Sequence, residues 1–207
     1  MRRLSITAAA LAVCLGFASQ ASANLLVNGS FETGDFTGWT VNANNTSVEP
    51  SGISGFGGYN AEDGHYYAAL GNVASAGPPL GTVAQSFTTT AGDSYTLTYY
   101  LASNGTTPNE FRTDINGTTY FDQTNIPTQP YTLYTYTFTA TGSSSTLTFY
   151  ERDDPNYLAL DNVSVNLAPL TAVVPEPSTL HPAGLAALLS LGHAWRRGRH
   201  RGRRPAA

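Results

Sequence analysis

Alternation of large side chains with threonine is the feature that most constrains how this chain can fold. In residues 95–102, Tyr and Leu occupy every second position, and Thr, Tyr and Ala fill the positions between them. The same period of two recurs in residues 134–140 and 146–150. Because successive side chains of a β-strand point to opposite faces, each run collects its large residues on one face, as a half-buried antiparallel strand requires. Residues 24–170 show no pattern with the period of an α-helix.

Turn signals separate these runs and define a series of short strands. Asn116-Gly117, between residues 111–115 and 118–121, is typical of a two-residue β-hairpin. We expect strands over residues 25–27, 38–42, 65–70, 81–88, 94–103, 110–115, 118–122, 131–140, 145–151 and 157–166. Many short strands without helices predict an all-β fold, a two-sheet antiparallel β-sandwich. The spacing of the strands leaves an immunoglobulin-like and a jelly-roll topology open.

The distribution of charge excludes several classes of function. The chain has 207 residues with 10 Arg, no Lys and 14 acidic residues. Thirteen of the acids lie in residues 32–161, where only Arg112 and Arg152 are basic, so this segment has a formal charge near −11. A body this acidic repels phosphate backbones, so we expect no nucleic-acid partner. The lack of Lys excludes P-loop NTPases and Schiff-base enzymes, and the single Cys14 leaves the acidic segment without disulfides or thiolate nucleophiles.

The first 23 residues are typical of a secretory signal peptide. Two Arg residues precede an apolar run over residues 4–18, and Ala21-Ser22-Ala23 fits the small-x-small site of signal peptidase. We therefore expect an N-terminal helix that signal peptidase removes, so that the exported protein begins at Asn24. An uncleaved membrane anchor is the alternative.

The last 39 residues combine a Pro-rich linker, a short apolar segment and an Arg cluster. The linker, residues 169–181, contains Pro175-Glu176-Pro177, and residues 182–207 contain the apolar segment and six Arg. This order is typical of a membrane helix that stops translocation, because the apolar part enters the bilayer and the cations stay in the cytoplasm. A stable span needs about 20 apolar residues, so this shorter segment suits a transient anchor. A plain C-terminal membrane tail is the alternative.

The run Val174-Pro175-Glu176-Pro177-Ser178-Thr179, followed by the apolar segment and the Arg cluster, resembles the PEP-CTERM sorting signal of Gram-negative bacteria. The resemblance implies processing at the Pro-Glu-Pro triplet by an exosortase-type transpeptidase. It also implies transient anchoring in the inner membrane, followed by delivery to the cell surface or to an extracellular matrix.

The start and the end of the acidic segment also resemble a known family. Residues 24–32, Asn-Leu-Leu-Val-Asn-Gly-Ser-Phe-Glu, precede Gly38-Trp39, and residues 158–165, Leu-Ala-Leu-Asp-Asn-Val-Ser-Val, close the segment. With residues 63–71, they are similar to the galactose-binding-like jelly rolls, which include several families of carbohydrate-binding modules. The resemblance implies a jelly roll of the galactose-binding-like type over residues 24–168, and it does not define a glycan.

The same resemblance implies a structural Ca²⁺ ion where the N-terminal segment meets the last strand. By position, its ligands would be Asn28, Glu32 and Asp161, together with loop carbonyls, and such hard oxygens are the ligands that Ca²⁺ prefers. The alternative is a solvated Asp161 at a strand kink, with Glu32 capping a turn.

The residues around Asp161 predict an irregular strand. The apolar residues at 158 and 160 share one face, whereas those at 163 and 165 have the opposite parity. A β-bulge at Asp161-Asn162 would reconcile the two and turn the carboxylate sideways.

Aromatic rings next to polar groups are candidates for a glycan-binding face, because sugars stack on flat rings and form hydrogen bonds with nearby polar side chains. The candidate residues are Asp63, Tyr66, Tyr67, Arg112 and Tyr150. The alternative is that the tyrosines belong to the core or to a plain sheet surface. Tyr66 and Tyr67 point to opposite faces if they lie in a strand, so we expect one of them to be buried. Trp39, the only tryptophan of the segment, is expected in the core.

Catalytic signatures are weak, and we expect no enzymatic activity. His65 is the only His of the acidic segment, and the chain has no Gly-x-Ser-x-Gly elbow. Adjacent acids such as Glu151, Asp153 and Asp154 are expected to be solvated. A polysaccharide-active hydrolase, the alternative, would need two carboxylates that face each other.

The sequence thus predicts an exported, non-catalytic surface or matrix protein. We expect its sandwich to associate with extracellular polysaccharide and an exosortase to sort it. A purely structural surface protein without a glycan site is the second possibility.

Overall fold

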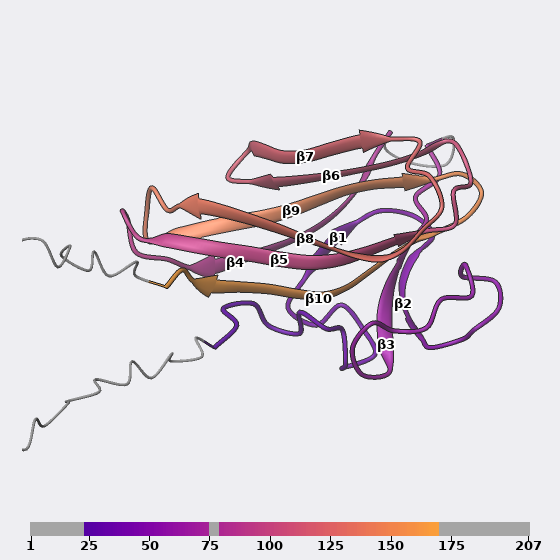
Figure 1. Ribbon diagram of the computed structural model, residues 1–207, viewed down its shortest axis with the longest axis horizontal. Coiled ribbons are helices and arrows are strands. Elements are labelled where there is room, and N and C mark those ends of the chain that lie inside the picture. The colour runs from indigo at the N-terminus through magenta and orange to yellow at the C-terminus, as the bar shows by residue number, and fades with distance from the viewer. Residues whose placement is uncertain (1–22, 75–78, 170–207) are drawn as a thin grey trace, which may run out of the picture. The chain divides into compact units, whose positions relative to one another are not determined.

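The computed structural model describes residues 23–74 and 79–169. They form ten β-strands in two sheets (Figure 1). In this part of the chain, no helix has the length and apolarity needed to cross a membrane. The predicted signal helix, the Pro175-Glu176-Pro177 triplet and the predicted C-terminal membrane helix lie outside the described residues.

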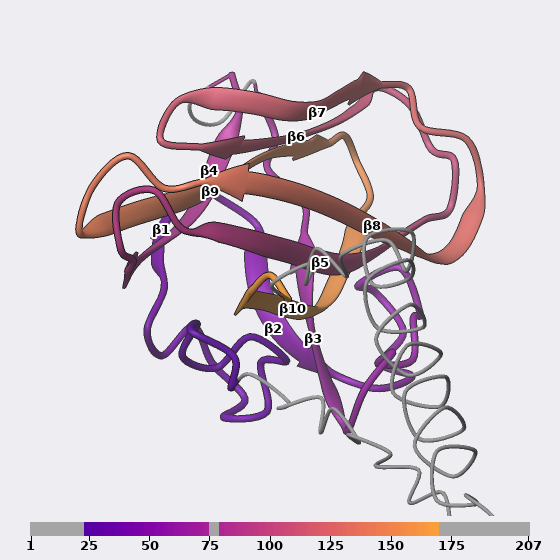
Figure 2. The same ribbon diagram turned by 60° about the vertical axis from the view of Figure 1, so that its left-hand side comes forward.

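The two sheets have five strands each, and all neighbouring strands are antiparallel. The first, here called the β9 sheet, has the spatial order β1 (Thr40–Asn42), β4 (Gly81–Thr88), β9 (Ser144–Asp153), β6 (Asn109–Ile115), β7 (Thr118–Thr124). The second, the β10 sheet, has the order β2 (Thr46–Pro50), β3 (Tyr66–Leu70), β10 (Leu158–Leu167), β5 (Ser94–Ser103), β8 (Gln129–Thr139). Figure 2 shows β7, β6 and β9 in one layer above β5, β10 and β3 in the other. The predicted all-β, two-sheet antiparallel sandwich is confirmed.

Aromatic side chains fill the space between the two sheets. The ring centroid of Tyr99 on β5 lies 5.2 Å from that of Phe149 on β9 and 5.2 Å from that of Tyr134 on β8. Thr113 on β6 donates a hydrogen bond of 2.9 Å to the Tyr99 hydroxyl, so this buried phenol has a partner. Trp39 belongs to the same core, as the sequence predicts. The large residues of the alternating runs therefore face inward, and their Thr neighbours face outward.

Two local predictions are confirmed. Asn116 and Gly117 have φ values of 50° and 79°, and they join β6 to β7 as the left-handed pair that a two-residue hairpin needs. The pairing of β10 with β5 shifts register between Asp161 and Ser164, and Asn162 has a φ of 49°. The bulge expected from the change of apolar parity is therefore present.

The N-terminal segment differs from the prediction. Residues 25–27 form no strand, and the side chain of Gln85 binds the backbone of Val27. Its amide accepts a hydrogen bond from the Val27 N–H at 2.7 Å and donates one to the Val27 carbonyl at 2.9 Å. Conversely, β2 was not expected, since its five half-buried residues show no alternation and end in Pro50.

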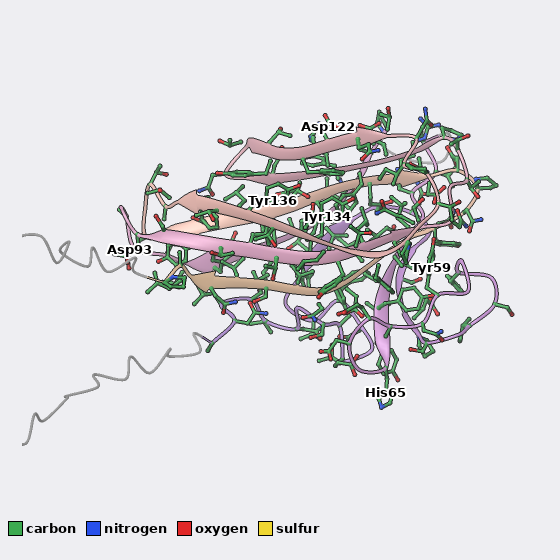
Figure 3. All side chains as sticks on the ribbon, in the orientation of Figure 1. Tyr59, His65, Asp93, Asp122, Tyr134 and Tyr136 are labelled. Carbon is green, nitrogen blue, oxygen red and sulfur yellow. The ribbon has the colours of Figure 1, made fainter. Side chains whose placement is uncertain are left out.

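A second, smaller core covers part of the outer face of the β10 sheet. Tyr67 on β3 is fully buried there, and Phe56 and Tyr59 from the loop 51–65 pack over it. The Tyr67 hydroxyl donates a hydrogen bond of 3.1 Å to the Phe56 carbonyl. Figure 3 shows Tyr59 beside β3, on the side of the sandwich opposite Asp122 on β7. The loop 51–65 therefore closes this part of the outer face.

The aromatic layer predicts that substitutions at neighbouring positions of β9 have very different effects on the free energy of unfolding. Phe149→Ala removes a fully buried ring that packs on Trp39, Tyr99 and Phe111, so we expect the free energy of unfolding to fall by about 3–5 kcal/mol in urea denaturation. Thr148→Ala, on the outward face, should change it by less than about 0.5 kcal/mol. Similar losses for both variants would contradict the assignment of the inner face.

Candidate functional site

The outer face of the β9 sheet carries a row of side chains from four adjacent strands. Arg112 on β6 stands opposite Tyr150 on β9 and opposite Asp122 on β7, and Tyr150 in turn stands opposite Thr82 on β4. Residues that are directly paired in an antiparallel sheet share one face. These paired residues therefore form one line across the sheet, which we call the Arg112–Tyr150 row. It consists of Asp122, Arg112, Tyr150 and Thr82.

The centre of this row is a cation–π contact. The guanidinium carbon of Arg112 lies 3.8 Å from the ring centroid of Tyr150. The Nε of Arg112 also lies 3.4 Å from the Oδ1 of Asp114, and 27% of the Arg112 side chain is exposed to solvent. The ring and the carboxylate fix the orientation of the guanidinium, whose remaining N–H donors stay available to a ligand.

The structure brings two of the five predicted glycan residues together and separates the other three. Arg112 and Tyr150 are in contact, whereas Asp63, Tyr66 and Tyr67 lie on or before β3 in the other sheet. Tyr66 is half-buried, and its ring packs against Gly34. The prediction of Tyr67 as a ligand residue does not fit the structure, because the loop 51–65 buries it completely, as expected for one of this pair. Asp122 and Asp114 were not among the predicted residues, because their place beside Arg112 depends on strand register.

The predicted calcium carboxylates Glu32 and Asp161 hold one turn between them. The Oε1 of Glu32 accepts hydrogen bonds of 2.8 Å from the N–H groups of His65 and Tyr66. The Oδ2 of Asp161 accepts hydrogen bonds from the N–H groups of Glu62 at 2.7 Å and Asp63 at 3.1 Å. The two carboxylates thus bind four N–H groups of residues 62–66, which fix the entry to β3.

Asp161 is fully buried, and both its burial and its hydrogen bonds affect the pKa of its carboxyl group. Its Oδ1 accepts a third hydrogen bond, of 2.6 Å, from the N–H of Asn162 at the bulge. Burial raises the pKa of Asp161 to about 7, although the hydrogen bonds from the backbone act in the opposite direction. Both carboxylate oxygens of Asp161 therefore receive N–H donors from the backbone.

The third predicted ligand, Asn28, makes local contacts. Its Oδ1 accepts a hydrogen bond of 3.2 Å from the Thr33 N–H, and its Nδ2 donates one of 2.8 Å to the Asp35 carbonyl. Among the residues that the structure describes, no group of three or more His, Cys, Asp or Glu side chains could hold a metal ion. The contacts of Asn28, Glu32 and Asp161 fit structural hydrogen bonding better than Ca²⁺ ligation, and calcium at these residues stays a prediction.

The expectation that Glu151 and Asp153 are solvated is wrong. Both residues are fully buried, because they continue the inward parity of Leu147 and Phe149 along β9. Burial raises the pKa of Glu151 to about 7. Burial, and then the charges of Glu151 and Asp154, raise the pKa of Asp153 to about 7. The alternation on β9 was the sequence signal that could have placed these two acids inside the sandwich.

The fold is that of the carbohydrate-binding-module-like jelly rolls. It is similar to a family 61 carbohydrate-binding module solved in complex with β-1,4-galactotriose (TM-score 0.52, 16% identity, 71% of this chain and 100% of that chain). It is also similar to the apo form of a cyclase from Fischerella sp. (TM-score 0.55, 19% identity, 73% and 98%) and to a tandem of family 22 modules from Paenibacillus barcinonensis Xyn10C (TM-score 0.50, 19% identity, 77% and 49%). At these identities, the likeness shows the fold alone.

The chain belongs to the family described as "Protein of unknown function (DUF642)", whose model matches residues 24–166. It is also 30% identical, over 193 residues, to halomucin of Haloquadratum walsbyi. The match covers 84% of this chain and 2% of halomucin, so the chain spans a very small part of that relative's length.

The buried carboxyl groups predict a dependence of stability on pH. The pKa values of Glu151, Asp153 and Asp161 lie near 7 in the folded protein, against ordinary values of 4.5 for Glu and 3.8 for Asp. The folded state therefore retains protons that the unfolded state releases, and this contribution to stability is lost as the pH rises through about 7. In chelator, we expect the melting temperature to fall from about pH 5 to about pH 8.

The matched variant for this prediction is the double substitution Glu151→Gln with Asp153→Asn. Because amides do not titrate, we expect the fall in melting temperature to become shallower. A melting temperature that rises over this range, or a double variant with the same slope as the unsubstituted protein, would contradict the assignment of raised pKa values.

Proposed function

We propose that this chain is an exported, non-catalytic protein that binds extracellular polysaccharide on the outer face of its β9 sheet. The observation that carries the proposal is the Arg112–Tyr150 row, in which a guanidinium held 3.8 Å from an aromatic ring lies on an open sheet face. The similarity of the fold to carbohydrate-binding modules supports the same function.

The chemistry of the row suits a glycan. A tyrosine ring offers an apolar surface to the C–H groups of a sugar, and a guanidinium donates hydrogen bonds to its hydroxyl groups. Asp122 is exposed beside Arg112 and can accept hydrogen bonds from the same hydroxyls. The neighbouring outward positions on β9 and β4 carry the small residues Thr148 and Ala84, which leave the face flat enough for an extended chain.

The carboxylates support a non-catalytic role. Hydrolysis of a glycosidic bond needs two carboxyl groups that reach the substrate from opposite sides. Glu151 and Asp153, which lie close together on β9, are fully buried between the sheets. Asp114 lies 3.4 Å from the Arg112 Nε, so its carboxylate is engaged by a cation and not held free to act as a general acid.

Binding is tested by affinity gel electrophoresis with a panel of polysaccharides that includes β-1,4-galactan. We expect retention of the protein by at least one polysaccharide, and Tyr150→Ala should weaken the affinity by about tenfold because it removes the ring and releases Arg112. Tyr100→Ala is the matched control, since Tyr100 is a half-buried tyrosine that faces outward on the β10 sheet.

Two outcomes would contradict this function. Equal loss of affinity in the Tyr100 and Tyr150 variants would show that the binding site does not lie on the outer face of the β9 sheet. Lack of retention by every polysaccharide, with a correctly folded protein, would favour the purely structural surface protein.

We also propose export by the secretory route and sorting by an exosortase, based on the sequence of the two termini. Mass spectrometry of the protein recovered from the producing cells tests both steps. We expect an N-terminus at Asn24 and the loss of residues after the Pro175-Glu176-Pro177 triplet. A protein that keeps residues 1–23 and 182–207 and stays in the cytoplasm would contradict the proposal.

A further inference from the structure

Two carboxylates without a positive partner lie at one end of the sandwich interior. Glu151 and Asp153 are fully buried and share the inward face of β9. The described part of the chain contains no Lys and only two Arg, and both are engaged elsewhere: Arg152 pairs with Asp154 at 3.0 Å and Arg112 with Asp114. His65 is exposed on the far side of the molecule from β7 (Figure 3). No protein cation described in the structure therefore neutralises this pair.

Glu151 connects the two sheets through neutral donors. Its Oε1 accepts a hydrogen bond of 2.8 Å from the hydroxyl of Thr46, at the start of β2. Its Oε2 accepts one of 3.0 Å from the N–H of Asn72, which follows β3. Each carboxylate oxygen thus has one neutral donor and keeps further lone pairs for another partner.

Asp153 has no such donors. Among the described residues, neither of its carboxylate oxygens has a hydrogen-bond partner, and both are shielded from solvent. Its backbone N–H, by contrast, donates to the Asn72 carbonyl at 3.3 Å, so the main chain is satisfied and the side chain is not. An ionised carboxylate in this state costs several kcal/mol unless a cation or a proton compensates it.

Gly81 on β4 lies close against the Glu151 carboxylate. A Cβ added to Gly81 would lie 2.4 Å from the Glu151 Oε1, 2.5 Å from the Cβ of Ala43 and 2.9 Å from the Cβ of Asn72. The backbone at Gly81 has no positive φ, so conformation does not require a glycine there. A glycine is needed because its neighbours pack closely, and a side chain at position 81 would displace the Glu151 carboxylate.

We propose that Glu151 and Asp153 bind one Ca²⁺ ion at the end of the sandwich where β9 meets β4, β2 and the segment after β3. The set of donors contains only oxygen, which suits a hard cation and not zinc. Ca²⁺ fits better than Mg²⁺, because Mg²⁺ keeps its water shell and demands strict octahedral geometry. Thr46 offers a further oxygen through its hydroxyl. This site is separate from the one predicted at Asn28, Glu32 and Asp161.

The ion would act as a structural link. Glu151 and Asp153 belong to the β9 sheet, whereas Thr46 and Asn72 belong to the β10 sheet or follow it directly. A cation bound here joins the two sheets at this end of the core. Binding to the folded state alone stabilises that state in proportion to the logarithm of the calcium concentration.

The test measures calcium binding by the purified full-length protein after chelation and dialysis. Equilibrium dialysis should find Ca²⁺ bound to the unsubstituted protein, and millimolar calcium should raise its melting temperature. Asp153→Asn should weaken the affinity by about tenfold or more and abolish the rise. In chelator, the same variant should melt at or above the temperature of the unsubstituted protein, since the amide removes an uncompensated charge.

The matched control is Asp161→Asn, which changes another fully buried carboxylate that has hydrogen-bond partners. It should lower the melting temperature in chelator and keep the calcium response. Glu151→Gln provides a second variant in case Asp153→Asn fails to fold, and it should also lose the response. The proposal is overturned if the unsubstituted protein binds no calcium, or if the response survives in Asp153→Asn and Glu151→Gln and disappears in Asp161→Asn.

Discussion

Packing of aromatic rings between the two sheets is the interaction on which the rest of the molecule depends. Tyr99 lies within ring contact of Phe111, Tyr134 and Phe149, so three strands of the sandwich besides its own are joined at one side chain. Once these rings face inward, the parity of every residue on β6 and β9 is fixed. Arg112 and Tyr150 must then face outward, and Glu151 and Asp153 must face the interior. One packing constraint therefore creates both the open polar row and the buried acidic pair.

Buried carboxylates are treated in two different ways in this structure. Asp161 receives three backbone N–H groups and uses them to hold the entry to β3 and the bulge of β10. Asp153 receives none, although it is equally buried. The protein itself supplies the hydrogen-bond partners of the Asp161 carboxylate, whereas the Asp153 carboxylate has no hydrogen-bond partner among the described residues. This contrast, and not the number of acidic residues, is why the end of β9 is the stronger candidate for a cation in the described part of the chain.

Local sequence signals predicted much of the fold, and long-range register limited the prediction of the site. The period of two located most strands, the Asn116-Gly117 pair located a hairpin, and the change of parity at residues 158–165 located the bulge. Strand β2 was not predicted, because its half-buried residues at the edge of the sheet show no alternation of large and small side chains. Arg112 and Tyr150 were both candidates, but their contact depends on the pairing of β6 with β9, which no local pattern contains. Burial of Tyr67 depends in the same way on a loop that folds back over β3.

The central functional claim is that a glycan binds across the outer face of the β9 sheet. It is tested most directly by mapping the backbone amide chemical shifts of the isotopically labelled protein during titration with soluble fragments of the polysaccharide that it retains. We expect the largest shifts at residues 110–114 on β6 and 148–152 on β9, with the inner core and the loop 51–65 unaffected. Shifts centred on the loop 51–65 and the β10 sheet, with residues 110–114 unchanged, would contradict it.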